Sequence, residues 1–371
     1  MKVVIASDSF KESMTALQAC HAIEKGLKEN NPAIETILCP LADGGEGTLE
    51  TLVHAMDGHI EYYDVHGPLM NIIQAPIGYV QDIAIIESAK VCGLELLEES
   101  QKNPYHTTTY GIGELILQAL NHHVQKILIC LGGSATNDGG IGMLQALGVH
   151  FYNQNHQDVV STMKGLQDID HISIEEMVSL PQDLSTIGVC DVNNPLCGEN
   201  GATYVYGPQK GVFLEDRESI DQAMAHYGYL TDTLFRHDYM NEEGSGAAGG
   251  LGYALKAYLH ASLKRGFDIV AETVSLEEKI QASDYVIVGE GKIDQQTQYG
   301  KTPYGVLKIA KKYGKNVYAF AGKVEDLDIL HSLGFKDVYA ITPAGLELSK
   351  ALQLGKENLK KCVYQHAEDM I

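Results

Sequence analysis

The chain has 371 residues, 44% of them hydrophobic, and carries 27 Lys and Arg against 49 Asp and Glu, for a formal net charge of −22. This length predicts two domains, and the acidic balance argues against binding to nucleic acid or to anionic membranes, which attract basic surfaces. The seven cysteines form no CxxC pair, residues 2–6 are too short for a signal peptide, and no apolar run approaches the ~18 residues of a membrane span, so we expect a cytoplasmic protein with reduced thiols.

The N-terminal pattern is a strand, a polar loop and a helix. Residues 2–6 predict a short buried strand, Asp8-Ser9-Phe10-Lys11 a loop, and the segment from Thr15 to Asn30 an amphipathic helix. A second strand over 35–39 leads into a loop at Asp43, and a helix begins again at Thr48.

The same order returns near the C-terminus. Strands are predicted over 285–288, 317–321 and 338–341, with a helix over 303–313. Strand, glycine loop and helix in this order predict an α/β fold with a doubly wound, Rossmann-like, three-layer domain that binds ligands at the carboxyl ends of its strands.

The middle of the chain differs, because residues 60–90 alternate short β-like runs with turns and so predict hairpins. A helix through Leu120 and a strand over 126–131 then restore a mixed α/β character. We therefore expect residues 60–265 to form a mixed α/β domain inserted into a domain made of residues 1–59 and 266–371, with the active-site cleft between the two.

Four stretches combine glycines with hydroxyls or carboxylates, namely residues 43–48, 132–140, 244–252 and 289–294. Glycine lets backbone N–H groups approach an anion, and carboxylates hold Mg²⁺ or accept a proton. A single stretch of this kind is as often a simple turn, but four of them favour a phosphate-binding site.

Two familiar nucleotide motifs fail in context. Gly244–Gly249 satisfies GxGxxG, yet residues 240–243 before it are not a strand, which leaves a glycine-rich entrance to a helix running from about Gly250 to Leu263. Either phosphate binding or close helix packing would explain those glycines. Gly300-Lys301-Thr302 resembles the end of a Walker A motif, but Gln295 replaces its first glycine, so a P-loop NTPase is rejected.

Taken together, several segments resemble the glycerate kinase family of bacterial glycerate and glucarate catabolism across essentially the whole chain. They are Ala6–Lys11, Pro40–Thr48, Gly133–Gly140, and Gly289–Asp294 with Thr297 and Gly300-Lys301. The resemblance implies ATP-dependent phosphorylation of D-glycerate at the 2-hydroxyl with Mg²⁺, on a two-domain α/β fold with the site in the cleft. This sequence departs from the family at Lys292, where arginine is commoner, and at Glu12, where glycine is usual.

The chemistry of phosphoryl transfer then selects candidate residues, because it needs cations, a positioned hydroxyl and a proton acceptor. We expect Lys11, Asp43 and Asp191 to be catalytic, with Asp43 and Asp191 also as Mg²⁺ ligands. Expected contacts to substrate come from Asp8, Ser9, Ser134, Thr136, Asn137, Asn193 and Lys301, and expected contacts to ATP from Gly246, Gly249, Gly289, Glu290, Gly291 and Asp294. Asp8, Asp138 and Glu46 could equally stabilise helix N-termini.

Three alternatives stay open. Phosphorylation at the 3-hydroxyl would need only a small rotation of glycerate in the same site. A non-catalytic sensor of small hydroxy acids would keep the cleft without turnover, and a nicotinamide-dependent oxidoreductase would use a similar α/β cleft. The sequence does not indicate the oligomeric state.

Overall fold

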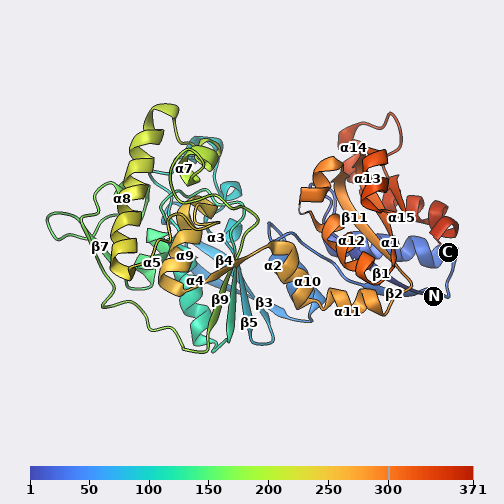
Figure 1. Cartoon of the computed structure of the whole chain (residues 1–371), viewed down its shortest axis with the longest axis horizontal. Helices are drawn as coiled ribbons and strands as arrows, with labels where there is room; N and C mark the ends of the chain where they lie inside the picture. The colour runs from blue at the N-terminus through green and yellow to red at the C-terminus, as the bar shows by residue number, and fades with distance from the viewer. Residues whose placement is uncertain (300, 371) are drawn as a thin grey trace. The chain divides into compact units, whose positions relative to one another are not determined.

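The computed structural model describes residues 1–299 and 301–370, so Gly300 of the Gly300-Lys301 motif lies outside the described residues. The chain divides into two compact units (Figure 1). Unit 1 comprises Met1–Asp43, Glu50–Met56 and Gly266–Ile371, and unit 2 comprises Gly44–Leu49 and Asp57–Arg265. Helix α2 (Thr48–Ala55) spans the boundary between these ranges.

Unit 1 is built on a five-stranded sheet in the order β13-β12-β11-β1-β2, in which every pairing is parallel. Its strands are β1 (Lys2–Ser7), β2 (Glu35–Leu38), β11 (Tyr285–Ile293), β12 (Asn316–Val324) and β13 (Asp337–Ala340). Its helices are α1 (Ala16–Asn30), α10 (Gly266–Thr273), α11 (Leu276–Gln281), α12 (Thr302–Lys312), α13 (Leu327–Leu333), α14 (Leu348–Gln353) and α15 (Gly355–His366). The strand and helix predictions for this unit are confirmed to within a few residues.

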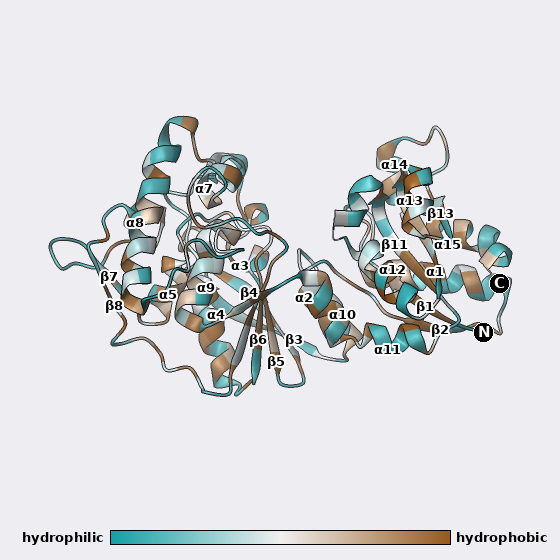
Figure 2. Ribbon diagram, viewed as in Figure 1, coloured by the Kyte–Doolittle hydropathy of each residue, from teal (hydrophilic) through white to brown (hydrophobic). Residues whose placement is uncertain are grey.

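Helices cover the unit 1 sheet because its strands are apolar on both faces. Residues 3–6 of β1 are fully buried, and β1 is coloured as hydrophobic in Figure 2. Val3, Ile5 and Ile287 share one core cluster with buried residues of α1 and α15, which pack against each other. Successive strand residues point to opposite faces, so the alternate residues face α12, which contacts β11 and β12.

Unit 2 contains a six-stranded mixed sheet in the order β10-β9-β6-β5-β4-β3, of which β10, β9, β6 and β5 are parallel and β4 and β3 are antiparallel. These strands are β3 (His59–His66), β4 (Ile72–Val80), β5 (Ile83–Glu87), β6 (Lys126–Cys130), β9 (Ser185–Val189) and β10 (Ser262–Lys264). A separate hairpin pairs β7 (His150–Tyr152) with β8 (His171–Ser173). The predicted hairpins over 60–90 and the strand at 126 are confirmed.

The helices of unit 2 are α3 (Ala89–Cys92), α4 (Tyr110–Asn121), α5 (Ile141–Ala146), α6 (Met163–Leu166), α7 (Ala202–Tyr206), α8 (Arg217–Phe235) and α9 (Leu251–Leu259). Short 3₁₀ helices occur at η1 (Leu94–Leu96), η2 (Glu99–Gln101), η3 (Pro208–Lys210), η4 (Leu214–Asp216), η5 (Ala247–Gly250), η6 (Gln295–Tyr299) and η7 (Ala367–Met370), the last two in unit 1. None of the helices described here combines the length and the apolar character that a membrane span requires.

One predicted element is wrong at its end. The helix expected to run to Leu263 stops at Leu259, where His260 adopts a left-handed conformation with φ of 52°. Residues 262–264 instead form β10, which pairs with residues 187–189 of β9. This pairing adds a fourth parallel strand to unit 2, and its carboxyl end lies at the same edge as those of β6 and β9.

Candidate functional site

The strand order of unit 1 places two loops from distant parts of the sequence next to each other. The chain moves from β1 outward to β2, and later enters β11 on the other side of β1, so the progression of strands reverses between β1 and β11. In open parallel sheets such a reversal is where ligands bind, at the carboxyl ends of the strands. Ser7 is in register with Gly289 there, and the N–H of Asp8 donates to the carbonyl of Gly289 at 2.9 Å.

Asp8 lies at this reversal in a strongly polar and mostly enclosed setting. Its carboxylate accepts hydrogen bonds from the Thr302 hydroxyl at 2.5 Å and from the Ser9 N–H at 2.6 Å. Loss of hydration, followed by the negative charges of Asp43 and Glu290, raises the pKa of Asp8 to about 7. The three carboxylates that follow or belong to β1, β2 and β11 therefore sit close enough to influence one another.

Glu290 is the second carboxylate of this edge, and it is paired with the lysine that precedes α12. Lys301 Nζ donates to Glu290 Oε1 at 2.9 Å and to the Lys292 carbonyl at 3.3 Å. The other oxygen, Oε2, is buried and has no hydrogen-bond partner among the described residues. Burial raises the pKa of Glu290, and the Lys301 ammonium opposes that rise.

Gly289 of β11 lets the Asp8 loop approach the strand, whereas Gly291 would leave room for a Cβ atom. A Cβ atom on Gly289 would lie 2.4 Å from Ser7 Oγ, and one on Gly291 would lie 3.5 Å from the Lys11 backbone nitrogen. Lys11 itself is exposed. The next residue, Glu12, has φ of 61°, a left-handed conformation in which glycine is less strained.

Asp294 lies farther along the same segment, where β11 has just ended. Lys292 Nζ bridges Asp294 at 2.8 Å and Glu325 at 2.7 Å, and this ammonium holds the pKa of Asp294 below its usual range. The Asp294 carboxylate also accepts the Gln296 N–H at 2.9 Å. Its oxygens are thus already engaged in fixing the turn before α12.

A second polar edge lies within unit 2, at the carboxyl ends of β6 and β9. The Leu131 N–H donates to the Val189 carbonyl at 3.1 Å, which keeps the segments that follow these two strands together. Ser134 follows β6, and exposed Asp191 and Asn193 follow β9. The structure thus gathers one set of predicted residues in unit 1 and another in unit 2.

The segment from Ser134 to Asp138 is buried and densely hydrogen bonded. Asp138 is fully buried, and its carboxylate accepts from Thr109 N and Thr109 Oγ1 at 2.9 and 2.8 Å and from the Gly140 N–H at 3.1 Å. Burial raises its pKa. Asn137 Nδ2 donates to Thr203 Oγ1 at 3.0 Å, whereas Asn137 Oδ1 is buried with no partner among the described residues.

Lys210 is a buried residue that the sequence did not single out. Only 2% of it is exposed, and its Nζ donates to Ser134 Oγ at 3.1 Å and to the Thr136 carbonyl at 2.7 Å. Loss of hydration lowers the pKa of Lys210 to about 8. The sequence signal is only a lysine between Gly207-Pro208 and Gly211, and it does not reveal that the turn folds onto a loop 74 residues earlier.

Close packing accounts for the two glycines predicted to bind the nucleotide through the GxGxxG segment. The Gly246 N–H donates to the Asn194 carbonyl at 2.9 Å, and a Cβ atom on Gly246 would lie 2.3 Å from the Pro195 carbonyl oxygen. Gly249 has φ of 70°, and a Cβ atom there would lie 2.1 Å from the Thr136 carbonyl oxygen. The packing alternative is thus sufficient to explain Gly246 and Gly249, and their nucleotide contacts stay a prediction.

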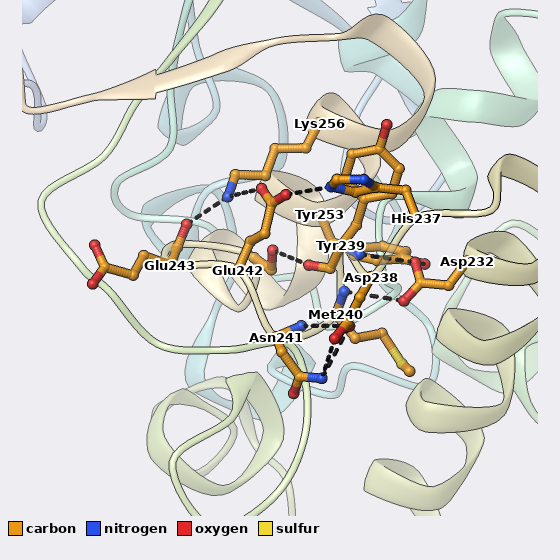
Figure 3. A network of polar contacts seen from close by, with 11 residues as sticks. Asp232, His237, Asp238, Tyr239, Met240, Asn241, Glu242, Glu243, Tyr253 and Lys256 are labelled. Atoms are coloured by element: carbon orange, nitrogen blue, oxygen red, sulfur yellow. Dashed lines mark hydrogen bonds and ion pairs between the residues drawn. The ribbon is translucent and has the colours of Figure 1, made fainter.

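The loop that precedes this segment is held by a network of charged and aromatic side chains (Figure 3). The Asp232 carboxylate accepts the N–H groups of Tyr239 and Met240, each at 3.2 Å, and the Tyr253 hydroxyl at 2.9 Å. The Met240 carbonyl in turn accepts the Leu196 N–H at 2.9 Å. The network therefore supports the strand-end segment that contains Asp191 and Asn193.

An ion pair closes the other side of this network. Glu242 accepts Lys256 Nζ at 2.7 Å and contacts His237 Nε2 at 2.7 Å, and Lys256 also donates to the Glu243 carbonyl at 2.7 Å (Figure 3). These contacts join α9 to the loop that leads into η5.

Unit 2 also has an open cavity of about 670 Å³ that contains none of the predicted site residues. It is lined by Met70, Tyr105, His106, Tyr110, Gln145, Val149, His150, Asp158, Val159, Val160, Ser161, Thr162 and Lys164. Over residues 1–299 and 301–370, no group of three or more His, Cys, Asp or Glu side chains could hold a metal ion by itself.

Comparison with known proteins gives one consistent result. The model of the glycerate kinase family matches residues 3–370. A glycerate kinase from Bacillus subtilis is 41% identical over 97% of this chain and 95% of its own length, and a glycerate 2-kinase from Escherichia coli is 40% identical over the same shares. A crystal structure from Salmonella typhimurium LT2, assigned as glycerate kinase 2, superposes with a TM-score of 0.91 at 41% identity and covers 100% of this chain and 98% of that one.

Proposed function

Because the chain belongs to the glycerate kinase family, we propose that it transfers the γ-phosphoryl group of ATP to D-glycerate, at the 2-hydroxyl, to give 2-phosphoglycerate. The observation that supports this proposal best is the grouping of Asp8, Asp43, Glu290 and Lys301 at the carboxyl edge of the unit 1 sheet. Cations and carboxylates are what phosphoryl transfer requires of a protein, since the reaction needs positioning and charge stabilisation more than covalent help.

In the proposed reaction the 2-hydroxyl oxygen of glycerate attacks the γ-phosphorus. The bond from that phosphorus to the β,γ-bridging oxygen breaks, and ADP leaves with the bonding electron pair. Asp191 accepts the hydroxyl proton, while Lys11 and Lys301 stabilise the charge on the transferred group. Asp43 binds substrate or metal beside them.

The remaining predicted residues divide between the two ligands. Asp8 and Ser9 of unit 1, with Ser134, Thr136, Asn137 and Asn193 of unit 2, are proposed to hold glycerate. Gly289, Glu290, Gly291 and Asp294 are proposed to hold ATP. Contacts of Gly246 and Gly249 with ATP stay a prediction, with close packing against the neighbouring carbonyl groups as the alternative. The cleft between two domains stays a prediction.

The donor set of this edge fits Mg²⁺. This ion usually takes one or two protein carboxylates together with phosphate oxygens and water. Glu290 Oε2 is a buried oxygen without a hydrogen-bond partner among the described residues, and Asp43 is the nearby exposed carboxylate. When bound with ATP, the ion would neutralise phosphate charge. Asp43 and Asp191 remain the proposed metal ligands, with Glu290 as an addition from the structure.

The test is the release of ADP from Mg-ATP with D-glycerate, with L-glycerate and without acid, followed by phosphorus NMR of the product. Release that depends on D-glycerate, with a phosphorus signal split by one proton, supports the 2-kinase because C2 carries one hydrogen. A signal split by two protons would move the assignment to the 3-hydroxyl. Binding of glycerate by folded protein without ADP release would favour the non-catalytic sensor.

A further inference from the structure

Lys210 is a buried charge without a counter-ion in contact. Burying an ammonium group is costly unless a carboxylate pairs with it. Among the described residues Lys210 forms no ion pair, and its Nζ donates hydrogen bonds to one hydroxyl and one carbonyl, Ser134 Oγ and the Thr136 oxygen. An ammonium has three donor hydrogens, so these two bonds leave one unassigned. Such a site is suited to an anion that arrives from outside.

The hydrogen bond from Lys210 fixes what Ser134 can do. An ammonium can only donate, so Ser134 Oγ must be the acceptor of the 3.1 Å bond. The Ser134 hydroxyl hydrogen is therefore directed away from Lys210, and the adjacent positive charge makes that O–H group a stronger donor. Gly132 and Gly133, directly before it, are exposed.

A second group in the same loop also lacks its partner. Asn137 is fully buried, its Nδ2 is bonded to Thr203, and its Oδ1 has no hydrogen-bond partner among the described residues. Buried polar atoms without partners are uncommon, and each calls for an explanation such as a ligand. The loop thus offers an oriented donor at Ser134 and an unpaired acceptor at Asn137, which together match a carboxylate with a hydroxyl on the adjacent carbon.

We infer that Lys210 is a positioning residue for substrate. It orients the Ser134 hydroxyl as a donor to the carboxylate of glycerate, and it supplies the positive charge near that carboxylate that the loop itself does not provide. The inference rests on the proposed function. It deepens that function by assigning recognition of the substrate carboxylate to Lys210 and Ser134 of unit 2.

The charged groups around Lys210 define the pH at which this effect should disappear. Cys92 and Asp138 are the titratable groups whose charge acts on it. Burial raises the pKa of the Cys92 thiol to about 12, so that thiol stays neutral through the relevant range, and burial also raises the pKa of Asp138. Lys210 is charged below its pKa of about 8 and loses its proton above it. Affinity for glycerate should therefore be high at low pH and fall as the pH rises through that value.

The experiment is calorimetric titration of D-glycerate into the full chain without nucleotide. It is done at about pH 6.5 and about pH 9.5, which lie on either side of the lowered pKa of Lys210. Lys210→Met should raise Kd by about tenfold or more at the lower pH and reduce the change in Kd between the two pH values to what the titration of Asp8 leaves. Lys210→Arg should retain affinity at the higher pH, because arginine stays charged. Lys164→Met, which removes one exposed lysine charge from the same unit, is the matched control.

The coupling between the two residues gives a second, independent readout. If Lys210 acts through Ser134, then Ser134→Ala should weaken binding and the double variant should be no weaker than the poorer single variant. Ser134→Ala also serves where Lys210→Met does not fold. Nucleotide affinity, measured by titration of a non-hydrolysable ATP analogue, should be unchanged in all of these variants.

The outcomes separate this inference from the proposed function. Wild-type protein that neither binds nor phosphorylates D-glycerate would overturn both. Wild-type protein that binds it while folded Lys210→Met binds it equally well, or loses nucleotide affinity instead, would overturn the inference alone. Additive effects of the two substitutions would also overturn it.

Discussion

Lys301 Nζ lies 2.9 Å from Glu290 Oε1, so the residue before α12 is joined to the middle of β11 across the carboxyl edge of the unit 1 sheet. The pair is partly exposed, with Glu290 the more enclosed partner. Because the second Glu290 oxygen has no hydrogen-bond partner among the described residues, this ammonium is the main cation that offsets the buried carboxylate. The arrangement leaves a positive and a negative group together at the place where the strand order reverses.

Replacement of Lys301 tests whether this pair serves the reaction. Lys301→Met should lower kcat/KM for ATP by about a hundredfold, as loss of a charged group facing a transferred phosphoryl group typically does. Lys308→Met, on the exposed side of the same helix, removes an equal charge and should leave kcat/KM within about twofold of wild type. Equal losses in both variants would mean that net charge, and not this contact, is what matters.

The raised pKa of Asp8 makes the stability of unit 1 depend on pH. A carboxyl group with an ordinary pKa near 3.8 in the unfolded chain and about 7 in the folded chain is bound more tightly to its proton in the folded state. Its contribution to stability is therefore fully present below the unfolded value and is lost as the pH rises through the folded value. Asp8→Asn keeps the group neutral throughout.

We expect the melting temperature of Asp8→Asn, relative to wild type, to rise steadily between pH 4 and pH 7 and to level off above that range. Thermal unfolding of both proteins in the same series of buffers measures this difference. A difference that stays constant with pH would show that Asp8 is ionised throughout in the folded protein.

Much of the fold could be predicted because its signals are local. Thr15 caps α1 with the capping box that Gln18 completes, and buried runs such as residues 3–6 identify β1 whatever their partner strand is. β10 was missed for the opposite reason. Only three residues long, it follows directly on an apolar helix and is a strand only because β9 lies beside it.

The candidate site residues also divide into those that the local sequence predicts and those that it does not. Asp8, Asp43, Glu290 and Lys301 could be chosen because polar residues after buried strands gather at one edge of a parallel sheet. Lys210 could not, because it lies in a short turn and its hydrogen bonds go to a loop distant in sequence.

Asp191 offers the most direct test of the chemical step. Asp191→Asn removes the proposed proton acceptor and keeps its size, so kcat should fall by about 10²-fold to 10⁴-fold with little change in KM for glycerate. Asp183→Asn, at an exposed position just before β9, is the matched control and should retain full activity. A rise in KM with kcat unchanged would instead assign Asp191 to substrate binding.

Glu12 occupies a backbone conformation that favours glycine, with φ of 61°. Glu12→Gly should relieve this strain and stabilise the protein by up to about 1 kcal/mol. The gain is limited to this value because glycine has greater conformational freedom in the unfolded chain. Glu12→Ala removes the same charge but keeps the strain, so it should give no such gain. Urea unfolding of the three proteins compares them, and equal stabilisation by both substitutions would point to the charge.

Gly249 distinguishes packing from phosphate binding in the GxGxxG segment. Its φ of 70° disfavours any side chain, and a Cβ atom would lie 2.1 Å from the Thr136 carbonyl oxygen that Lys210 also contacts. Gly198 has φ of 86° but no atom within 4 Å of such a Cβ, so Gly198→Ala reports the backbone strain alone. We expect Gly198→Ala to lower the free energy of unfolding by about 1 kcal/mol and Gly249→Ala by about 3 kcal/mol or more.

The two explanations differ in which property the Gly249→Ala substitution changes. If packing is the role of Gly249, Gly249→Ala should lower the free energy of unfolding more than Gly198→Ala does. Displacement of the Thr136 carbonyl should then also weaken glycerate binding. If Gly249 instead approaches a phosphate group, both alanine variants should lose similar stability, and only Gly249→Ala should lose affinity for an ATP analogue. Denaturant unfolding and nucleotide titration of the same two variants therefore decide between a structural and a ligand-binding glycine, and the contact with Thr136 leads us to expect the structural one.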